Sequence, residues 1–403
     1  MNSRYDLFSP AFKADPFPTF AALRAGDPIY AHQAPDGSTV WYITRYDDVL
    51  AVLKDTERFI KDPRNIGAAA LVAHKAPGPN QAINQNMLFS DPPDHTRLRA
   101  LVNQAFTPRR VERMASQIQA VANELLDRGQ TPGRMDLIAA YALPLPVIVI
   151  SDMLGIPAAD RDEVCDWSQS IISPGRQRLT YSARRRRLRA FLTYLRDIFA
   201  DRRRQPRDDL ITALVQAEQA GDRLTEEELS SMVALLLVTG HETTVNLIGN
   251  GVLALLRRPA QLARLKANPA VLDNAVEELL RFDGPVETST TRWARCDVEF
   301  GGQLIRQGDV VRVVLASANR DPAHFAEPDQ LDLTRPDCQR HLAFGHGSHY
   351  CLGAPLARLE GRIALATLFE RLPDLRLSGR EDQLQWRSGV LFRGLERLPV
   401  RWG

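Results

Sequence analysis

The sequence of 403 residues has only four cysteines, at positions 165, 296, 338 and 351. Thiols so few and so widely spaced exclude a disulfide scaffold, and they favour a reducing, cytoplasmic location. An excess of charge of one sign is also lacking, because 51 basic and 49 acidic side chains leave a net charge of +2. Nucleic acid is therefore not expected as the main partner.

Long hydrophobic runs are missing as well. The first 20 residues carry four charges among three prolines, so they contain no apolar signal core. The apolar stretches at 143–150 and 232–238 are far shorter than the ~20 residues that a bilayer-spanning helix needs. A hydrophobic share of 44% and a charged share of 25% are typical of a soluble globular protein, and no membrane partner is expected.

Helical periodicity covers much of the chain. Apolar residues recur at helical spacing in residues 109–126, 184–203 and 209–220, and the five arginines of 184–189 are interpreted as a solvated helix face. Strand-forming residues gather in 39–44, 297–314 and 393–402, with breaks at Gly301-Gly302 and Gly308-Asp309. Residues 62–86 are expected to form a long loop. The fold class is mainly helical with a minor β-sheet region, and no repeat or linker divides it.

The densest motif is a glycine-rich segment around the last cysteine, FGHGSHYCLG, from Phe344 to Gly353. Glycines allow positive φ and a close approach to something flat. Cys351 precedes a helical pattern, and a helix N-terminus favours a thiolate, which is one ligand of haem iron. Two alternatives are a small buried hydrophobe and a zinc site made of Cys338, His341, His346 and Cys351.

Polar residues interrupt a long apolar helix expected from Thr225 to about Arg257. Thr225 and Glu228 form a capping box at its start. Thr239-Gly-His-Glu-Thr-Thr244 lies in its middle, where buried polar groups are costly unless they have a function. The alternative is that Thr243 only bonds back to the carbonyl of Thr239.

Two pairs of charged residues share helix faces. Glu278 and Arg281 are three apart, as in a common exposed ion pair. His95 and Arg99 are four apart after two prolines, and such a pair suits carboxylates such as the haem propionates, although a solvated helix start is the alternative.

In order along essentially the whole chain, these segments resemble the cytochrome P450 family, the haem-thiolate monooxygenases, of the soluble bacterial type. The resemblance implies a single cytochrome P450-like haem domain over residues 1–403. It implies a large triangular fold with haem b buried between the long central helix and the helix of the cysteine loop. One departure is Thr239, where the family usually has alanine or glycine.

The same resemblance implies roles for individual residues. Cys351 becomes the axial iron ligand, and Thr243 and Glu242 become the catalytic hydroxyl and acid that handle dioxygen and its protons. Other residues are implied to contact haem: His95, Arg99, Gly240, Arg292, Phe344, His349 and Gly353. Glu278, Arg281 and Arg320 are implied to form a buried charge triad with a structural role.

The implied reaction inserts one oxygen atom from O2 into a hydrophobic small molecule, by hydroxylation or epoxidation. Polyketides, terpenoids, steroids and fatty acids all fit the apolar lining expected from residues 62–89, 165–180, 286–290, 391–392 and the helix before Gly240. A ferredoxin and its reductase are expected to supply electrons to a monomer, because the chain has no flavin or iron–sulfur segment. The basic face expected for the ferredoxin comprises Arg109, Arg110, Arg340, Arg358 and Arg362.

Two other functions remain open. One is a peroxide-driven haem-thiolate peroxygenase, which needs no ferredoxin but generally alters the acid–threonine pair. The other is a non-enzymatic gas sensor, which shares Cys351 but does not need Glu242 and Thr243.

Overall fold

The computed structural model describes residues 4–67, 85–128, 133–172, 180–217 and 221–403. Its chain contacts divide the protein into two compact units. The first unit comprises Met1–His74, Ala122–Ala142 and Thr243–Gly403, and the second comprises Lys75–Val121 and Leu143–Glu242.

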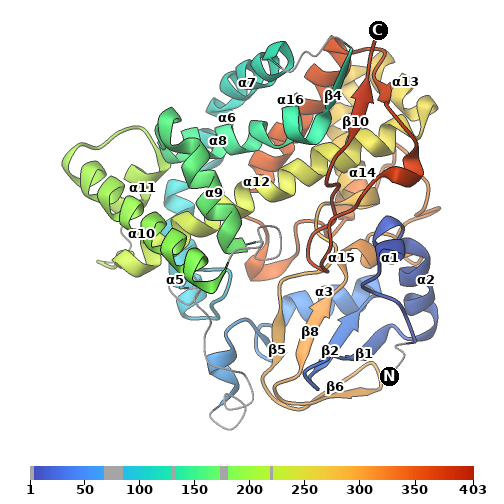
Figure 1. Ribbon diagram of the computed structural model, residues 1–403. Coiled ribbons are helices and arrows are strands. Elements are labelled where there is room, and N and C mark those ends of the chain that lie inside the picture. The colour runs from blue at the N-terminus through green and yellow to red at the C-terminus, as the bar shows by residue number, and fades with distance from the viewer. Residues whose placement is uncertain (1–3, 68–84, 129–132, 173–179, 218–220) are drawn as a thin grey trace. The chain divides into compact units, whose positions relative to one another are not determined.

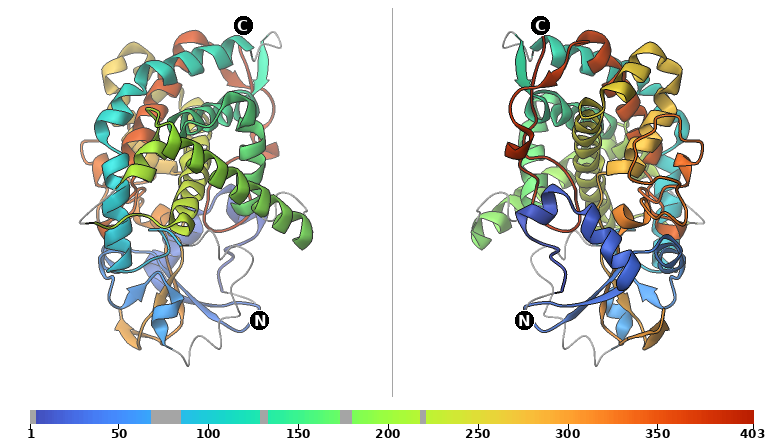
Figure 2. Two further views of the ribbon diagram at one scale, coloured as in Figure 1. Left: turned by 90° about the vertical axis from the view of Figure 1, so that its left-hand side faces the viewer. Right: turned by 90° about the vertical axis from the view of Figure 1, so that its right-hand side faces the viewer.

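The first unit contains the sheets. Its main sheet has five strands in the order β1-β2-β8-β5-β3, formed by β1 (Ile29–Gln33), β2 (Thr39–Ile43), β8 (Val310–Val313), β5 (Arg292–Ala294) and β3 (Phe59–Ile60). Strands β2 and β8 are parallel and the other neighbours are antiparallel. A second sheet pairs β10 (Pro399–Arg401) with β4 (Arg134–Asp136) and β9 (Arg376–Leu377). Gly403 ends the chain beside β10, at the opposite end of this unit from β1 and β2 (Figure 1, Figure 2).

Alternating and β-branched residues explain these strands. In β2, Trp41 pairs with Ala31 of β1 and with Val311 of β8, and all of Trp41–Ile43 is buried. The short hairpin of β6 (Val298–Phe300) and β7 (Gln303–Ile305) turns at Gly301 and Gly302. Their φ angles of 53° and 77° are left-handed, as a tight hairpin turn requires. The strands predicted in 39–44 and 297–314 are thus confirmed.

The first unit also carries helices around the sheets. Its helices are α1 (Pro10–Ala14), α2 (Phe17–Gly26), α3 (Tyr46–Lys54), α13 (Pro259–Ala267), α14 (Leu272–Asp283), α15 (Leu315–Ala318), α16 (Ala354–Arg371) and the π-helical turn η3 (Ile138–Ala142). Phe12 of α1 and Phe20 of α2 pack with Tyr42 of β2 in one apolar cluster. The N-terminal helices therefore lie against the main sheet (Figure 1).

The second unit is mainly helical. Its helices are α5 (Asp94–Ala105), α6 (Pro108–Arg113), α8 (Pro144–Leu154), α9 (Arg161–Ile172), α10 (Tyr181–Arg204) and α11 (Leu210–Gln216). Helices α7 (Ala115–Arg128) and α12 (Glu226–Leu256) run from one unit into the other. The helical pattern in 109–126 is confirmed, and the structure divides it between α6 and α7. The amide of Met114 bonds to Val111 and Glu112 rather than four residues back, which ends the α-helical ladder of α6.

The long helix expected from Thr225 is confirmed as α12. The Thr225 amide donates to Oε2 of Glu228 at 2.9 Å, and the Glu228 amide donates to Oγ1 of Thr225 at 3.2 Å. This reciprocal pair is the predicted capping box. Helix α12 is long and apolar enough to cross a membrane, but 72% of its most apolar window is buried inside the protein. It is therefore a core helix, and the expected mainly helical fold with minor sheets is confirmed.

Candidate functional site

Cys351 lies in an irregular loop that ends at the start of α16. Gly345 and Gly347 have φ angles of 70° and 75°, which side chains with a Cβ rarely adopt. A Cβ on Gly347 would also lie only 3.1 Å from the carbonyl oxygen of Leu53. The Cys351 amide donates to the carbonyl of Phe344 at 3.0 Å, and Cys351 is exposed. The loop therefore holds an accessible thiol just before the N-terminus of an 18-residue helix, where its thiolate form is favoured.

The zinc alternative fails on the chemistry of its proposed ligands. The Cys338 thiol is already engaged, since it donates to Oδ1 of Asn274 at 3.2 Å, and burial raises its pKa to about 12. Both ring nitrogens of His341 are engaged, one with Glu277 and one with the amide of Ala343. Among the residues that the structure describes, no group of three His, Cys, Asp or Glu side chains could hold a metal.

The donor set of the first unit fits haem. A soft, exposed thiol at position 351 is the ligand type of a haem-thiolate iron. Arg292, on β5, is 1% exposed and donates to the carbonyl of Phe59 at 3.4 Å, so it is a buried cation of the kind that a propionate neutralises. Phe344, His349 and Gly353 lie in the same loop as Cys351.

Residues of the second unit with predicted haem roles lie on α5 and α12. His95 and Arg99 share one face of α5, and His95 is buried. Burial lowers the pKa of His95, and the nearby charge of Arg99 lowers it further. Gly240 and the buried Glu242 lie near the middle of α12.

The polar turn of α12 has two features that the sequence did not reveal. A Cβ on Gly240 would lie 3.0 Å from Cγ1 of Ile150, so the glycine lets α8 pack closely against α12. The Thr239 hydroxyl donates to the carbonyl of Leu235 at 2.7 Å. The side chain that departs from the family pattern thus bonds back along its own helix.

A buried acid that the sequence analysis missed lies next to this turn in the first unit. The Thr244 hydroxyl donates to Oε2 of Glu360 at 3.1 Å, and Glu360 is fully buried on α16. Burial raises the pKa of Glu360 to about 8, although the Thr244 hydrogen bond opposes the shift. Its second oxygen, Oε1, has no hydrogen-bond partner among the described residues. The sequence feature that could have identified Glu360 is its position among the apolar residues of the helix after Cys351.

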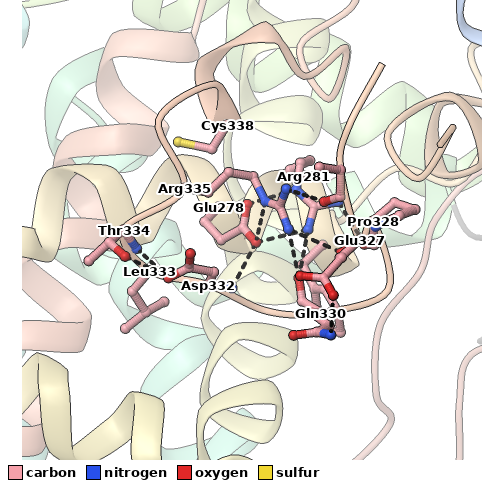
Figure 3. A network of polar contacts seen from close by, with 12 residues as sticks. Glu278, Arg281, Glu327, Pro328, Gln330, Asp332, Leu333, Thr334, Arg335 and Cys338 are labelled. Carbon is pink, nitrogen blue, oxygen red and sulfur yellow. Dashed lines mark hydrogen bonds and ion pairs between the residues drawn. The ribbon is translucent and has the colours of Figure 1, made fainter. Parts of the chain in front are cut away.

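The buried charge triad has a different third member from the one predicted. Glu278 and Arg281 are both 0% exposed and form two hydrogen bonds, of 2.7 and 2.8 Å. Nε of Arg335 donates to Oε1 of Glu278 at 3.2 Å (Figure 3). Arg320 instead donates to the carbonyl of Phe282 and to Asp329, with its guanidinium stacked on aromatic rings. The prediction of Arg320 as the third member was wrong, because its guanidinium binds the Phe282 carbonyl near the end of α14.

The expected basic face is only partly available. Arg340 and Arg362 are exposed in the first unit, whereas Arg358 is bound by both carboxylate oxygens of Glu277. Arg109 is exposed in the second unit, where Arg110 lies 3.5 Å from Asp208. Arg358 is therefore not a free cation for a partner protein.

Comparisons with known proteins show which family the chain belongs to. Residues 150–388 match the family model described as cytochrome P450. The chain is 46% identical over 394 residues to cytochrome P450 monooxygenase PikC of Streptomyces venezuelae, covering 97% of this chain and 92% of PikC. It is 44% identical over 403 residues to vitamin D(3) 25-hydroxylase of Pseudonocardia autotrophica, covering 99% and 97%.

A solved structure is similar over the whole fold. The cytochrome P450 PksS of the Bacillus subtilis bacillaene polyketide synthase superposes with a TM-score of 0.91 at 42% identity, covering 98% of this chain and 100% of PksS. The chain belongs to the cytochrome P450 family, whose members bind haem b, and it is an oxidoreductase of the monooxygenase type.

Proposed function

We propose that the protein inserts one oxygen atom from O2 into a hydrophobic small molecule, by hydroxylation or epoxidation, with electrons from a ferredoxin and its reductase. The observation that carries the proposal is the exposed Cys351 thiol, held by two left-handed glycine turns directly before α16. The chain acts as a single haem domain over residues 1–403, as a cytoplasmic monomer.

Each predicted residue has a task in this proposal. When bound, haem supplies the activation of dioxygen that side chains cannot provide. Cys351 binds the iron as a thiolate, and α16 stabilises that charge. Arg292, His349, His95 and Arg99 bind the carboxylates of the cofactor, while Gly240, Phe344 and Gly353 contact the rest of it. The Glu242 carboxyl donates a proton, and the Thr243 hydroxyl relays protons by accepting one hydrogen bond while donating its own.

The substrate class rests on the apolar lining and on the relatives. The predicted segments 286–290 and 391–392 lie side by side, since the Glu287 amide donates to the carbonyl of Leu391 at 2.8 Å and Val286 bridges Phe392. The predicted segments 62–89 and 165–180 lie in part outside the described residues. By their names, PksS belongs to polyketide synthesis and another relative hydroxylates vitamin D3. A polyketide or a similarly bulky alicyclic molecule is the substrate class we favour, ahead of a fatty acid.

The iron ligand is tested by the spectrum of the reduced, carbon-monoxide-bound protein. The wild type should show the red-shifted band of haem-thiolate proteins, and Cys351→Ser should abolish it. Cys296→Ser removes an exposed thiol from another segment and should leave the band unchanged. A persistent band in Cys351→Ser, or wild-type protein without haem, would overturn the proposal.

The substrate class is tested by adding a compound library while recording the haem band. Macrolide and steroid-like compounds should shift the band at lower concentrations than linear fatty acids. Tighter binding of linear fatty acids would contradict the substrate class. Full turnover with peroxide alone would instead favour the peroxygenase, and binding without turnover by either route would favour the sensor.

A further inference from the structure

Glu277 is a buried carboxylate that no step of the proposed chemistry uses. It lies on α14, one residue before Glu278, and its side chain is 9% exposed. Nε of Arg358 donates to its Oε1 atom at 2.6 Å, and Nη2 of Arg358 donates to its Oε2 atom at 2.9 Å. Nε2 of His341 lies 3.2 Å from Oε2. One carboxylate thus binds two cationic or polar side chains from different segments.

The tautomer of His341 follows from its second nitrogen. The Ala343 amide donates to Nδ1 of His341 at 3.1 Å, so Nδ1 is an acceptor. The proton of a neutral imidazole is therefore on Nε2, and Nε2 donates to Glu277. Burial alone would raise the pKa of Glu277, but hydrogen bonds from Arg358 and His341 outweigh it and lower the pKa to about 2. The carboxylate is therefore charged throughout the neutral range.

The two partners of Glu277 come from the two sides of the cysteine loop. His341 and Ala343 precede the loop, and Arg358 lies in the first turns of α16, directly after it. The guanidinium of Arg358 lies 4.6 Å from the ring centre of Phe344, which is the distance of a cation–π contact. The carbonyl of Phe344 in turn accepts the hydrogen bond of the Cys351 amide. Contacts therefore run without a gap from Glu277 to the backbone of the predicted iron ligand.

We infer that Glu277 is a positioning residue that clamps both ends of the cysteine loop through His341 and Arg358, and thereby fixes the Cys351 thiolate and the reduction potential of the iron it binds. The inference rests on the proposed haem-thiolate site. Partners beyond the ligand itself orient it and tune the metal, and their loss commonly costs ~10–100-fold in metal affinity or activity.

The decisive variant is Glu277→Gln in the haem-loaded protein. It keeps the size of the side chain, but it removes the charge and turns an amide N–H₂ toward groups that are themselves donors. We expect haem to transfer to an apoglobin about tenfold faster than from the wild type. We also expect a larger fraction of the blue-shifted, inactive carbon-monoxide complex. The reduction potential should move in the positive direction, because the cation of Arg358 is left uncompensated.

Two further variants separate positioning from general stability. Asp209→Asn removes the carboxylate charge from another buried arginine pair, that of Arg202 and Asp209 in the second unit, and asparagine still caps α11. It should lower the unfolding midpoint without moving the potential or the carbon-monoxide spectrum. Glu277→Asp keeps the charge and should restore most of the wild-type potential. The inference would be overturned if Glu277→Gln kept the wild-type reduction potential, carbon-monoxide spectrum and rate of haem transfer. It would also be overturned if Asp209→Asn shifted the potential and the spectrum as much as Glu277→Gln does. Wild-type protein without the red-shifted band would instead refute the proposed haem-thiolate site.

Discussion

Oε1 of Glu278 accepts a hydrogen bond from Nε of Arg335 at 3.2 Å and another from Nη2 of Arg281 at 2.8 Å. The amide of Asp332 donates to the same oxygen at 3.0 Å. This carboxylate has no exposed surface, and its hydrogen bonds come from two arginines and one backbone amide. Such a site is costly to break, because removal of one partner leaves buried charge uncompensated.

A double-mutant cycle tests the membership of this triad. We expect Glu278→Gln and Arg335→Gln to be coupled by about 1–3 kcal/mol in the free energy of unfolding, measured by urea denaturation, because the two side chains are in contact. The matched cycle with Arg320→Gln should give coupling within about 0.5 kcal/mol of zero. Equal coupling for the two arginines would contradict the structural assignment.

Thr243 is expected to keep oxygen chemistry coupled to product formation. In Thr243→Ala, product formed per electron pair should fall by at least about tenfold and peroxide should appear, because the hydroxyl that relays protons by hydrogen bonding is gone. Peroxide release and product are measured together, with a compound from the haem-band titration. Thr244→Ala is the neighbouring control: it loses the bond to Glu360 and about 1 kcal/mol of stability but remains coupled. Coupled turnover in Thr243→Ala would refute this role.

Glu360 makes stability depend on pH in a defined window. Its pKa is about 8 in the folded protein, above the 4.5 that is ordinary for a glutamate, so the folded state keeps a proton that the unfolded state releases. The free energy of unfolding should therefore decrease as pH rises from 4.5 to 8. Glu360→Gln should flatten this decrease and add on the order of 1–3 kcal/mol at pH 8, by urea unfolding at pH 5 and pH 8. The exposed Glu381→Gln is the control, and an unchanged slope in Glu360→Gln would exclude the elevated pKa.

Electron transfer should depend steeply on ionic strength. An acidic ferredoxin is attracted by exposed cations, and salt screens that attraction. Charge reversal at Arg340 or Arg362 should slow reduction of the iron by about tenfold at low salt, in stopped-flow measurements. Reversal at Arg376, an exposed arginine on β9, should have little effect. A flat salt response would remove the argument for an electrostatically guided ferredoxin.

Sequence reasoning succeeded where a local pattern determines a local structure. The Thr225–Glu228 capping box and the Gly301-Gly302 turn both follow from residues that lie within four positions of each other. It failed for contacts between distant segments. Nothing near Arg335 or Glu360 in the sequence identifies Glu278 or Thr244 as its partner, and Met114 ends a helix without a glycine or proline. The fold class was predictable from composition and periodicity, whereas the network behind the cysteine loop required coordinates.

The triad also acts on the backbone of the segment that follows α15. Arg281 donates to the carbonyls of Asn319, Pro328 and Gln330, and Arg335 donates to those of Ala326, Glu327 and Gln330 (Figure 3). The two guanidinium groups thereby supply hydrogen bonds to the backbone carbonyls of this irregular stretch, as the amides of neighbouring strands do in a sheet. Since they recognise peptide groups rather than side chains, the surface side chains of this stretch can be replaced while its course through the protein stays fixed.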